Sequence, residues 1–431
     1  MLQYLIYLPY IVVLAELVIC WISPLAAFSF ISAIRLILPP NIRVGPVSMN
    51  TVCLVILVLF IFIKREKTYF YRKEKPFSLI SSLVVPLAFV CLFGMEVPYT
   101  LQYADLLKMV ITEITPFICL TLIIKRREDL VSFIKTLFAA YIVVGLYGIY
   151  TGIIGMNPVY DLCSIVFEYT DEVGDRLSDL RGMMEGEASG NFSSGIPWGQ
   201  VSLLIFSLAL FFPDTKETML RHTVIILSMA NCLMSGKRAA IMPMLLIACV
   251  YLMMHVKLKP KHIAASLLSV CFMLILGLTN QTTMKFFESN VMPSILFWDD
   301  SYAEKKDVKG SSKEMRLEQL EECTRIASKY PIFGYGNNYY IYEGEKYPKM
   351  RGFESLYFCV VTSFGYVGVL IWGMFFYRCY HYTKGSRTKG ILMYYHLPFW
   401  TAILLTNMTG TLYLYMLMVG IHSKNNKCII K

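Results

Sequence analysis

Long apolar blocks are the feature that most constrains what this chain can fold into. Of its 431 residues, 56% are hydrophobic and only 16% are charged. The apolar residues gather in blocks long enough to cross the hydrocarbon layer of a bilayer as helices. The sequence therefore predicts an all-α, polytopic membrane protein. Twelve transmembrane helices are predicted, at about residues 3–22, 47–63, 78–94, 101–124, 130–154, 192–212, 222–236, 239–255, 262–279, 354–378, 391–408 and 410–422.

One further apolar stretch, residues 24–38, is harder to assign from sequence. Arg35 interrupts it and Pro39-Pro40 closes it, so it either extends the first helix or lies in the membrane interface. No polar domain follows the first apolar block, and no cleavable signal peptide is predicted.

The positions of lysine and arginine predict the orientation. If the spans alternate, six connections fall on one side and hold 21 cations, whereas the opposite short connections hold six. Both termini are therefore predicted in the cytoplasm. The net charge of +10 follows mostly from this topology, and it does not indicate nucleic-acid binding.

Two longer segments are predicted outside a single membrane domain that covers residues 1–431. Residues 155–191 form an acidic extracytoplasmic loop, and residues 280–353 form a large one with eleven cations and eleven anions. Within the large loop, residues 313–330 predict an amphipathic helix whose less polar face carries Leu317, Leu320, Thr324 and Ala327. Pro331 and the turn at residues 334–336 end this helix.

Candidate metal and disulfide sites are few. Asp299-Asp300 is either a solvated acidic pair or a divalent-cation site. Cys163 and Cys323 are predicted in the exported loops, where a disulfide between them is one alternative to two free thiols. Phosphate-loop, paired-histidine and nucleophile-elbow motifs are absent from the sequence, and no cofactor is predicted.

A basic turn, Ser235-Gly236-Lys237-Arg238, separates two apolar runs. It would fix two cations at a membrane face, where they either bind a lipid-borne anion or extend to lipid headgroups. Glu16 and Glu113 lie within apolar blocks. Each is either a functional group or a polar contact between helices.

The order of these elements resembles the O-antigen polymerase and ligase family of bacterial envelope enzymes. The resemblance covers about residues 181–373, and the first five spans agree in hydropathy alone. Its pieces are Arg181 with Gly190-Asn191-Phe192, the turn and helix start at residues 235–240, Arg316, Pro331-Ile332-Phe333-Gly334-Tyr335-Gly336, and Glu354-Ser355-Leu356-Tyr357 followed by Gly365-Tyr366-Val367-Gly368.

The resemblance implies glycan transfer from a polyprenyl diphosphate to a sugar hydroxyl at the outer face of the bacterial inner membrane. It assigns Arg238 and Arg316 to the diphosphate, with Arg181 and Lys237 as further candidates. Arginine suits this task because its planar fork binds phosphate oxygens in pairs and keeps its proton. Such cations would replace a metal, and each typically contributes about 10²- to 10³-fold in rate.

Glu354 is the candidate general base for the acceptor hydroxyl. The ligase branch has histidine at the corresponding place, so Glu354 favours a repeat-unit polymerase. Its alternative is an ion pair with Arg351. Tyr335, Tyr339, Tyr340 and Tyr342 either stack on sugar rings or anchor the loop at the interface.

Two rival functions remain open at this stage. An O-antigen ligase would transfer the finished glycan to lipid A-core, and a lipid-linked oligosaccharide flippase would form no new bond. The expected partners are the polyprenyl-diphosphate-linked oligosaccharide and membrane lipids, with a chain-length regulator and a flippase as candidate protein partners. Internal symmetry of the kind common in transporters is not evident in the sequence.

Overall fold

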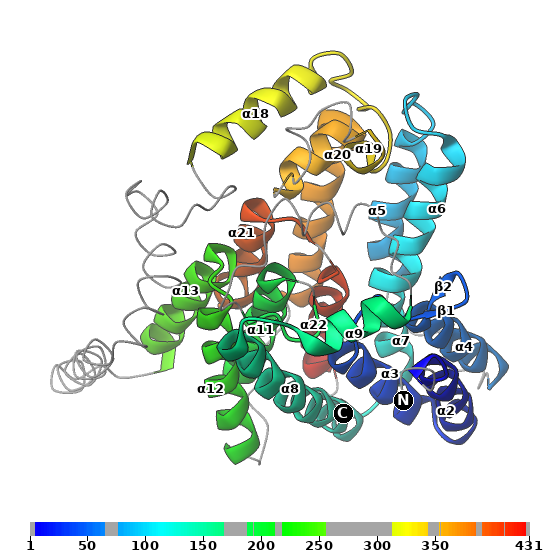
Figure 1. Cartoon of the computed structure of the whole chain (residues 1–431), viewed down its shortest axis with the longest axis vertical. Coiled ribbons are helices and arrows are strands. Elements are labelled where there is room, and N and C mark those ends of the chain that lie inside the picture. The colour runs from blue at the N-terminus through cyan, green and yellow to red at the C-terminus, as the bar shows by residue number, and fades with distance from the viewer. Residues whose placement is uncertain are drawn as a thin grey trace, which may run out of the picture.

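A computed structural model of the chain describes residues 5–64, 76–167, 188–192, 194–211, 218–255, 313–343, 353, 355–384, 390–408 and 410–427, which are mostly helical (Figure 1). The first half contains α2 (Leu8–Ile22), α3 (Pro24–Ile37), β1 (Arg43–Val44), β2 (Val47–Ser48), α4 (Met49–Ile63), α5 (Pro76–Val90), α6 (Tyr99–Met109), η1 (Val110–Ile114), α7 (Thr115–Ile123), α8 (Arg127–Ile154), α9 (Pro158–Val166) and α11 (Gly195–Phe211). The second half contains α12 (Thr218–Met234), α13 (Arg238–His255), α18 (Lys313–Ala327), α19 (Tyr339–Tyr342), α20 (Leu356–Thr383), η4 (Leu392–His396), α21 (Leu397–Leu405) and α22 (Leu412–Lys427).

Each predicted span that falls within the described ranges contains a helix. Three continuous helical segments there are long and apolar enough to cross a membrane, namely Tyr99–Ile123, α8 and α20. Shorter apolar helices occupy most of the other predicted positions. The described residues are mostly helical, with one short pair of strands, whereas the count of twelve spans is not confirmed. The span predicted at 262–279 lies outside the described residues.

The stretch that the sequence left open is a helix of its own, α3. It starts where the Ser23 hydroxyl accepts a hydrogen bond from the Ala26 amide at 3.3 Å, and Pro24 occupies its first turn. Phe28 stacks on Phe133 of α8 at a centroid distance of 4.9 Å, and both rings are fully buried. The stretch therefore does not extend α2, because the extended backbone of Ser23 separates the two helices and α3 packs against α8.

The first three helices reverse direction twice. Lys64, at the end of α4, donates to the Cys20 carbonyl near the end of α2 at 3.1 Å, and Trp21 contacts Phe60 edge to face. The C-terminal ends of α2 and α4 thus lie at the same end of the bundle, and α3 runs back between them. The predicted alternation placed a single helix before residue 47, where the structure has two.

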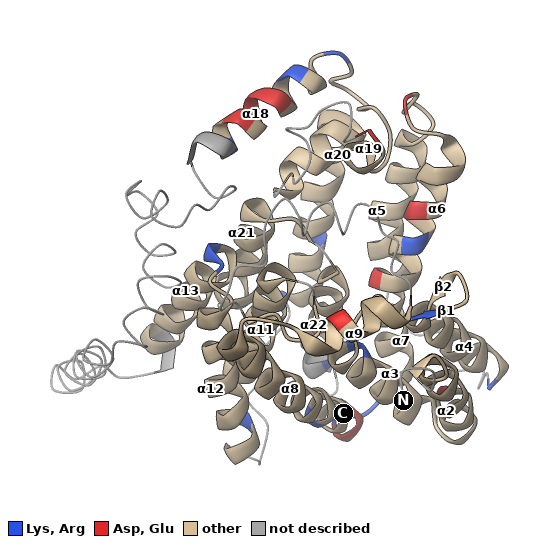
Figure 2. Ribbon diagram, viewed as in Figure 1, with Lys and Arg blue, Asp and Glu red and all other residues tan. Residues whose placement is uncertain are grey.

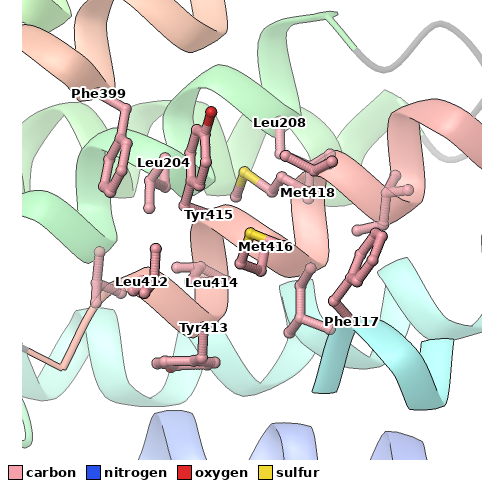
Figure 3. Close-up of a cluster of buried hydrophobic side chains, with 14 of the residues drawn as sticks. Phe117, Leu204, Leu208, Phe399, Leu412, Tyr413, Leu414, Tyr415, Met416 and Met418 are labelled. Carbon is pink, nitrogen blue, oxygen red and sulfur yellow. The ribbon is translucent and has the colours of Figure 1, made fainter. Parts of the chain in front are cut away.

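The helix α22 forms the centre of the bundle. Every residue from Leu412 to Lys424 is buried or nearly so, on all sides of the helix. Figure 3 shows its side chains between Phe117 of α7, Leu204 and Leu208 of α11, and Phe399 of α21. A helix that is apolar all round must be enclosed by others, and α22 organises the helices that surround it.

The helix α18 confirms the amphipathic helix predicted in the large loop. It lies at one end of the molecule against α20 (Figure 1), and Figure 2 shows acidic and basic residues along it, unlike most of the bundle. The predicted apolar face is right only at Ala327, which is buried, and wrong at the other three residues. Leu317 and Leu320 are 49% and 42% exposed, whereas Gln319, Cys323 and Ile326 are buried. The face of α18 that carries Cys323 packs against α20 and the turn after α18, so that face is buried.

Candidate functional site

The longest helix at this end of the molecule, α20, is broken at Gly365. The residue has φ 62° and ψ −164°, which ends the regular hydrogen bonding of the helix there. The turn at residues 331–336 fills the gap. Tyr335 and Gly336 donate their amides to the carbonyls of Thr362 and Ser363 at 3.0 and 2.9 Å.

The pairing also runs in the opposite direction. The amides of Tyr366 and Val367 donate to the carbonyls of Pro331 and Ile332 at 2.8 and 3.1 Å. Broken backbone inside a membrane bundle is tolerated only where protein groups satisfy it. These four bonds do so, and they join two pieces of the sequence pattern, residues 331–336 and residues 365–368, into one unit.

Glycine is required on both sides of this junction. A Cβ on Gly365 would lie 2.4 Å from the Ile332 carbonyl oxygen, and one on Gly334 would lie 2.6 Å from the Gly365 nitrogen. Both residues have positive φ values, which strain other L-residues. The spacing of glycines in the two pieces thus has a steric cause.

The same turn is fastened to α6 through Gln102, which is fully buried. The Asn337 amide donates to Gln102 Oε1 at 3.0 Å, and Asn337 Nδ2 donates to the Gln102 carbonyl at 3.0 Å. Next to it, Asn338 Nδ2 and the Tyr342 hydroxyl each donate to Asp105 Oδ2 at 2.8 Å. Three elements, α6, α19 and α20, therefore meet around the turn.

The basic turn lies between α12 and α13. Gly236 has φ 63°, and Lys237 and Arg238 are half-buried at the start of α13. The turn packs closely on α11, because a Cβ on Gly199 would lie 2.8 Å from Ser235 Oγ and from Ala240 Cβ. The Ala188 amide donates to the Met234 carbonyl at 2.9 Å, which brings the segment at 188–192 beside this turn.

Hydrogen bonds through α11 connect the neighbourhood of the basic turn to that of α19. Gln200, adjacent to Gly199 and fully buried, donates to Thr406 Oγ1 at 2.6 Å and to the Asn407 carbonyl at 3.0 Å. Asn407 Nδ2 in turn donates to the Tyr340 hydroxyl at 3.3 Å. The connection between α21 and α22 is thus a polar bridge across the centre of the bundle.

A cavity of about 180 Å³ opens where this bridge meets α6 and α20. Its lining is mixed. The polar lining residues are Asp105, Asn337, Asn338, Tyr340, Ser363 and Asn407, and the apolar and aromatic ones are Leu87, Leu106, Met109, Leu356, Cys359, Val360, Phe364, Trp372 and Met408. This cavity was not predicted from the sequence. Asn407 within an apolar block and the Asn337-Asn338 pair after the turn were its available signals.

The predicted site residues have separate outcomes. Lys237, Arg238 and Arg316 are described and half-buried, with Arg316 in the first turn of α18. Arg181 and Glu354 lie outside the described residues, although Phe353 and Ser355 on either side of Glu354 are buried. The convergence of these cations and Glu354 on one pocket stays a prediction.

Of the two alternatives left open for Cys163 and Cys323, the structure has two free thiols and no disulfide between them. Cys163 belongs to α9, and Cys323 packs against α20 with its sulfur 4.0 Å from the Phe358 carbonyl oxygen. Burial raises the pKa of Cys323 to about 12. Asp299-Asp300 lies outside the described residues. Elsewhere in the described chain, no group of three metal-ligating side chains comes together.

The two acidic residues within apolar helices differ in their surroundings. Glu113, in the π-helical turn η1, pairs with Arg35 of α3 at 2.8 Å and accepts the Tyr413 amide at 2.8 Å. The Arg35 guanidinium also lies over the Tyr413 ring at 3.5 Å. Glu113 is therefore a polar contact between helices. Glu16 is fully buried and accepts a hydrogen bond from the Cys20 thiol at 3.5 Å.

The four candidate tyrosines lie in different surroundings. Tyr335 and Tyr339 are buried and stack on each other at 4.3 Å, and the Tyr335 hydroxyl donates to the Ile326 carbonyl at 2.7 Å. In this structure these two hold α18 and the turn together, which fits neither sugar stacking nor interfacial anchoring. Tyr340 lines the cavity. Burial and the hydrogen bond to Asp105 raise the pKa of the Tyr342 hydroxyl to about 12.

The chain forms a bundle of apolar helices, with α18 at one end and a basic turn between α12 and α13. These features are those of a polytopic membrane protein. Within it, residues 223–373 match a protein-family model described as O-antigen ligase. The match runs from α12 through the basic turn and α18 to the break in α20. It supports membership of the O-antigen ligase and polymerase family and confirms the resemblance drawn from the sequence. No curated protein and no solved structure matched the chain.

Proposed function

We propose that this protein polymerises polyprenyl-diphosphate-linked oligosaccharide repeat units of a surface polysaccharide, an O-antigen or a capsule, at the outer face of the bacterial inner membrane. The observation that carries the proposal is the family match over residues 223–373, since members of that family are glycosyltransferase-like enzymes acting on lipid-linked sugars or glycans. The matched range contains Lys237, Arg238, Arg316 and Glu354.

The proposed chemistry is a single displacement at the anomeric carbon. The acceptor hydroxyl oxygen forms a bond to that carbon, the bond to the diphosphate oxygen breaks, and Glu354 accepts the hydroxyl proton. Arg238 and Arg316, with Lys237 and Arg181, stabilise the charge that develops on the departing polyprenyl diphosphate. Direct attack inverts the anomeric configuration. A product linkage that keeps the donor configuration would contradict this step.

The proposed orientation follows the distribution of cations, with α18 and α19 outside and the cation-rich connections in the cytoplasm. The parallel α2 and α4 then place the Leu8 end of α2 outside as well. The C-terminal end of α22 stays in the cytoplasm, as the cation distribution predicts. The position of α2 thus differs from the sequence expectation for the N-terminus. Fusion of alkaline phosphatase and of green fluorescent protein to each terminus tests it. Fluorescence from the N-terminal fusion would contradict the revised orientation.

The decisive experiment incubates the purified protein with a lipid-linked repeat unit and no added metal. A ladder of longer lipid-linked glycans is the expected product. Transfer that occurs only to lipid A-core would identify a ligase, and movement of the substrate across vesicles without a new bond would identify a flippase.

The base is tested separately. Glu354→Gln is expected to abolish chain extension while the protein accumulates normally, because the amide cannot take the proton. Glu343→Gln, in the same outer segment, serves as the matched control. Full extension by the Glu354→Gln protein would remove the assignment.

A further inference from the structure

We propose that Gln200 of α11 is a positioning residue for glycosyl transfer, which sets the spacing between the basic turn and the start of α20. The inference rests on the proposed function and deepens it, since the turn carries the proposed diphosphate-binding cations and Glu354 directly precedes Ser355, the N-cap of α20. Figure 1 shows α11 in the middle of the bundle, near α13 and α21, which it contacts.

The polar groups of the Gln200 side chain are all bound by one short connection, that between α21 and α22. Gln200 Nε2 donates to Thr406 Oγ1 at 2.6 Å and to the Asn407 carbonyl at 3.0 Å. Its Oε1 accepts from Thr411 Oγ1 at 2.6 Å. Because a carbonyl can only accept, the bond to Asn407 fixes the orientation of the amide. One fully buried side chain thus holds both ends of this connection.

These bonds fix the connection in a way that apolar packing would not. The helix α11 is mostly apolar and buried on all sides. Apolar contacts have no preferred direction, whereas a hydrogen bond weakens steeply as it bends. A buried amide must also keep its partners, because an unsatisfied polar group in the interior is costly. Gln200 therefore holds the connection at a defined position relative to α11.

The basic turn packs on the same stretch of α11. Gly199 precedes Gln200, and a Cβ on Gly199 would lie 2.8 Å from Ser235 Oγ and from Ala240 Cβ. Lys237-Arg238 lies between these two contacts in the sequence. The point of α11 that binds the α21–α22 connection is therefore the point against which the cation-bearing turn is placed.

The other end of the connection contacts the start of α20. Asn407 Nδ2 donates to Cys359 Sγ at 3.4 Å. The Cys359 thiol donates to the Phe353 carbonyl at 3.8 Å, and its amide donates to the Ser355 carbonyl at 3.2 Å. Through one intermediate side chain, Asn407 is thus joined to the residues that precede and follow Glu354 in the sequence.

A shift of this connection would change the spacing between the cations and the start of α20. Direct displacement needs the acceptor hydroxyl and the departing diphosphate nearly in line on opposite sides of the anomeric carbon, and a misplacement of about 1 Å can cost about 10²-fold in rate. Binding of the diphosphate itself depends on the cations and not on the acceptor side. A positioning role for Gln200 therefore predicts a fall in kcat with little change in donor affinity.

The test compares Gln200→Met with Ser202→Ala in the purified full-length protein in nanodiscs. Methionine removes all three hydrogen bonds of Gln200. Ser202 is equally buried on α11, but its hydroxyl accepts from Tyr141 of α8 at 2.8 Å and not from the α21–α22 connection. Thr411→Val removes only the bond to Gln200 Oε1, and Thr411→Ser keeps it. Thermal unfolding, kcat and KM for extension of a lipid-linked repeat unit, and affinity for sugar-free polyprenyl diphosphate are measured for each variant.

Gln200→Met is expected to lower kcat about 10- to 100-fold, with the affinity for polyprenyl diphosphate within about twofold of the wild-type value. Thr411→Val is expected to lower kcat about three- to tenfold. Thr411→Ser is expected to extend chains at the wild-type rate, because its hydroxyl still donates to Gln200. Ser202→Ala is expected to lower the melting temperature and leave kcat unchanged.

A Gln200→Met protein that extends chains with the wild-type kcat would overturn the inference. An equal fall in kcat in Ser202→Ala would also overturn it, because the effect would then be one of stability. If Gln200→Met does not fold, equal kcat values for Thr411→Val and Thr411→Ser would overturn it instead. The wild type reports separately on the proposed function. A wild type that makes no ladder would overturn the polymerase and the role of Gln200 with it, whereas a wild-type ladder with unaffected variants would remove the role of Gln200 alone.

Discussion

Among the interrupted helices in the described part of the bundle, α20 and the α6–η1–α7 segment are repaired in different ways. In α20 the break at Gly365 is closed by four backbone hydrogen bonds from the turn at residues 331–336. Between α6 and α7 the π-helical turn η1 carries Glu113, which is held by the Arg35 guanidinium and the Tyr413 amide. Backbone repair depends on the absence of side chains at two glycines, whereas side-chain repair depends on one charged pair.

The difference separates a rigid junction from a replaceable contact. Backbone bonds cannot be removed by changing a side chain, so the α20 junction fails only if the turn is pushed away. The Arg35–Glu113 pair can be removed one partner at a time, and each removal leaves a charge inside the bundle. The first arrangement belongs to the segment that matches the family, and the second lies outside it.

The largest effect is expected from Gly365→Ala. The new Cβ would lie 2.4 Å from the Ile332 carbonyl oxygen at a φ of 62°, so the turn must separate from the helix and break the four backbone hydrogen bonds between them. We expect a loss of folded protein by fluorescence-detected size exclusion. Gly373→Ala on the same helix is the control, because a Cβ there meets nothing within 4 Å. Equal yields of the two variants would show that the junction is not rigid.

The next effect concerns the charged pair. Glu113→Gln or Arg35→Met is expected to destabilise the bundle by about 3–5 kcal/mol, because each strands its partner in the interior. The double variant should lose less than the sum of the two, as measured by thermal unfolding in nanodiscs. Lys329→Met is the control, since the Lys329–Glu96 pair is 62% and 34% exposed and screened by solvent, so its loss should leave thermal unfolding nearly unchanged. Additive losses would contradict the pairing.

The smallest effect is expected at Tyr335, which joins α18 to the turn. Tyr335→Phe keeps the stacking on Tyr339 and removes the hydrogen bond to the Ile326 carbonyl. A loss of about 0.5–1.5 kcal/mol is expected in thermal unfolding, with faster proteolysis near α18. Tyr342→Phe, at an exposed position, is the comparison. An equal loss in both would show that α18 does not depend on the buried tyrosine.

Sequence reasoning located the helices better than it located their contacts. Apolar blocks predicted α8 and α20 because a span needs only length and hydropathy. The sequence did not reveal α3 as a separate buried helix, because Arg35 interrupts the apolar stretch. Glu113, the partner of Arg35, lies 78 residues away in the sequence. The face of α18 was mostly wrong for a similar reason, since α20 and the turn decide which residues are covered.

The candidate site could likewise be predicted only in part from the sequence. The resemblance picked out residues 331–336 and 365–368 as separate pieces, and only the structure joined them by backbone hydrogen bonds. The cavity escaped notice because Asp105, Ser363 and Asn407 are polar residues in three separate segments of the chain. Nothing in their spacing shows that they meet.

The central claim is that arginines from separate parts of the matched segment bind the diphosphate of the donor. Chain extension by Arg238→Lys and Arg316→Lys, measured with the purified protein and a lipid-linked repeat unit, tests it most directly. Each variant keeps a positive charge and loses the bidentate fork, so a fall of about 10²- to 10³-fold in rate is predicted for each, with Arg325→Lys unchanged. Extension at the wild-type rate by either of the two site variants would contradict the claim.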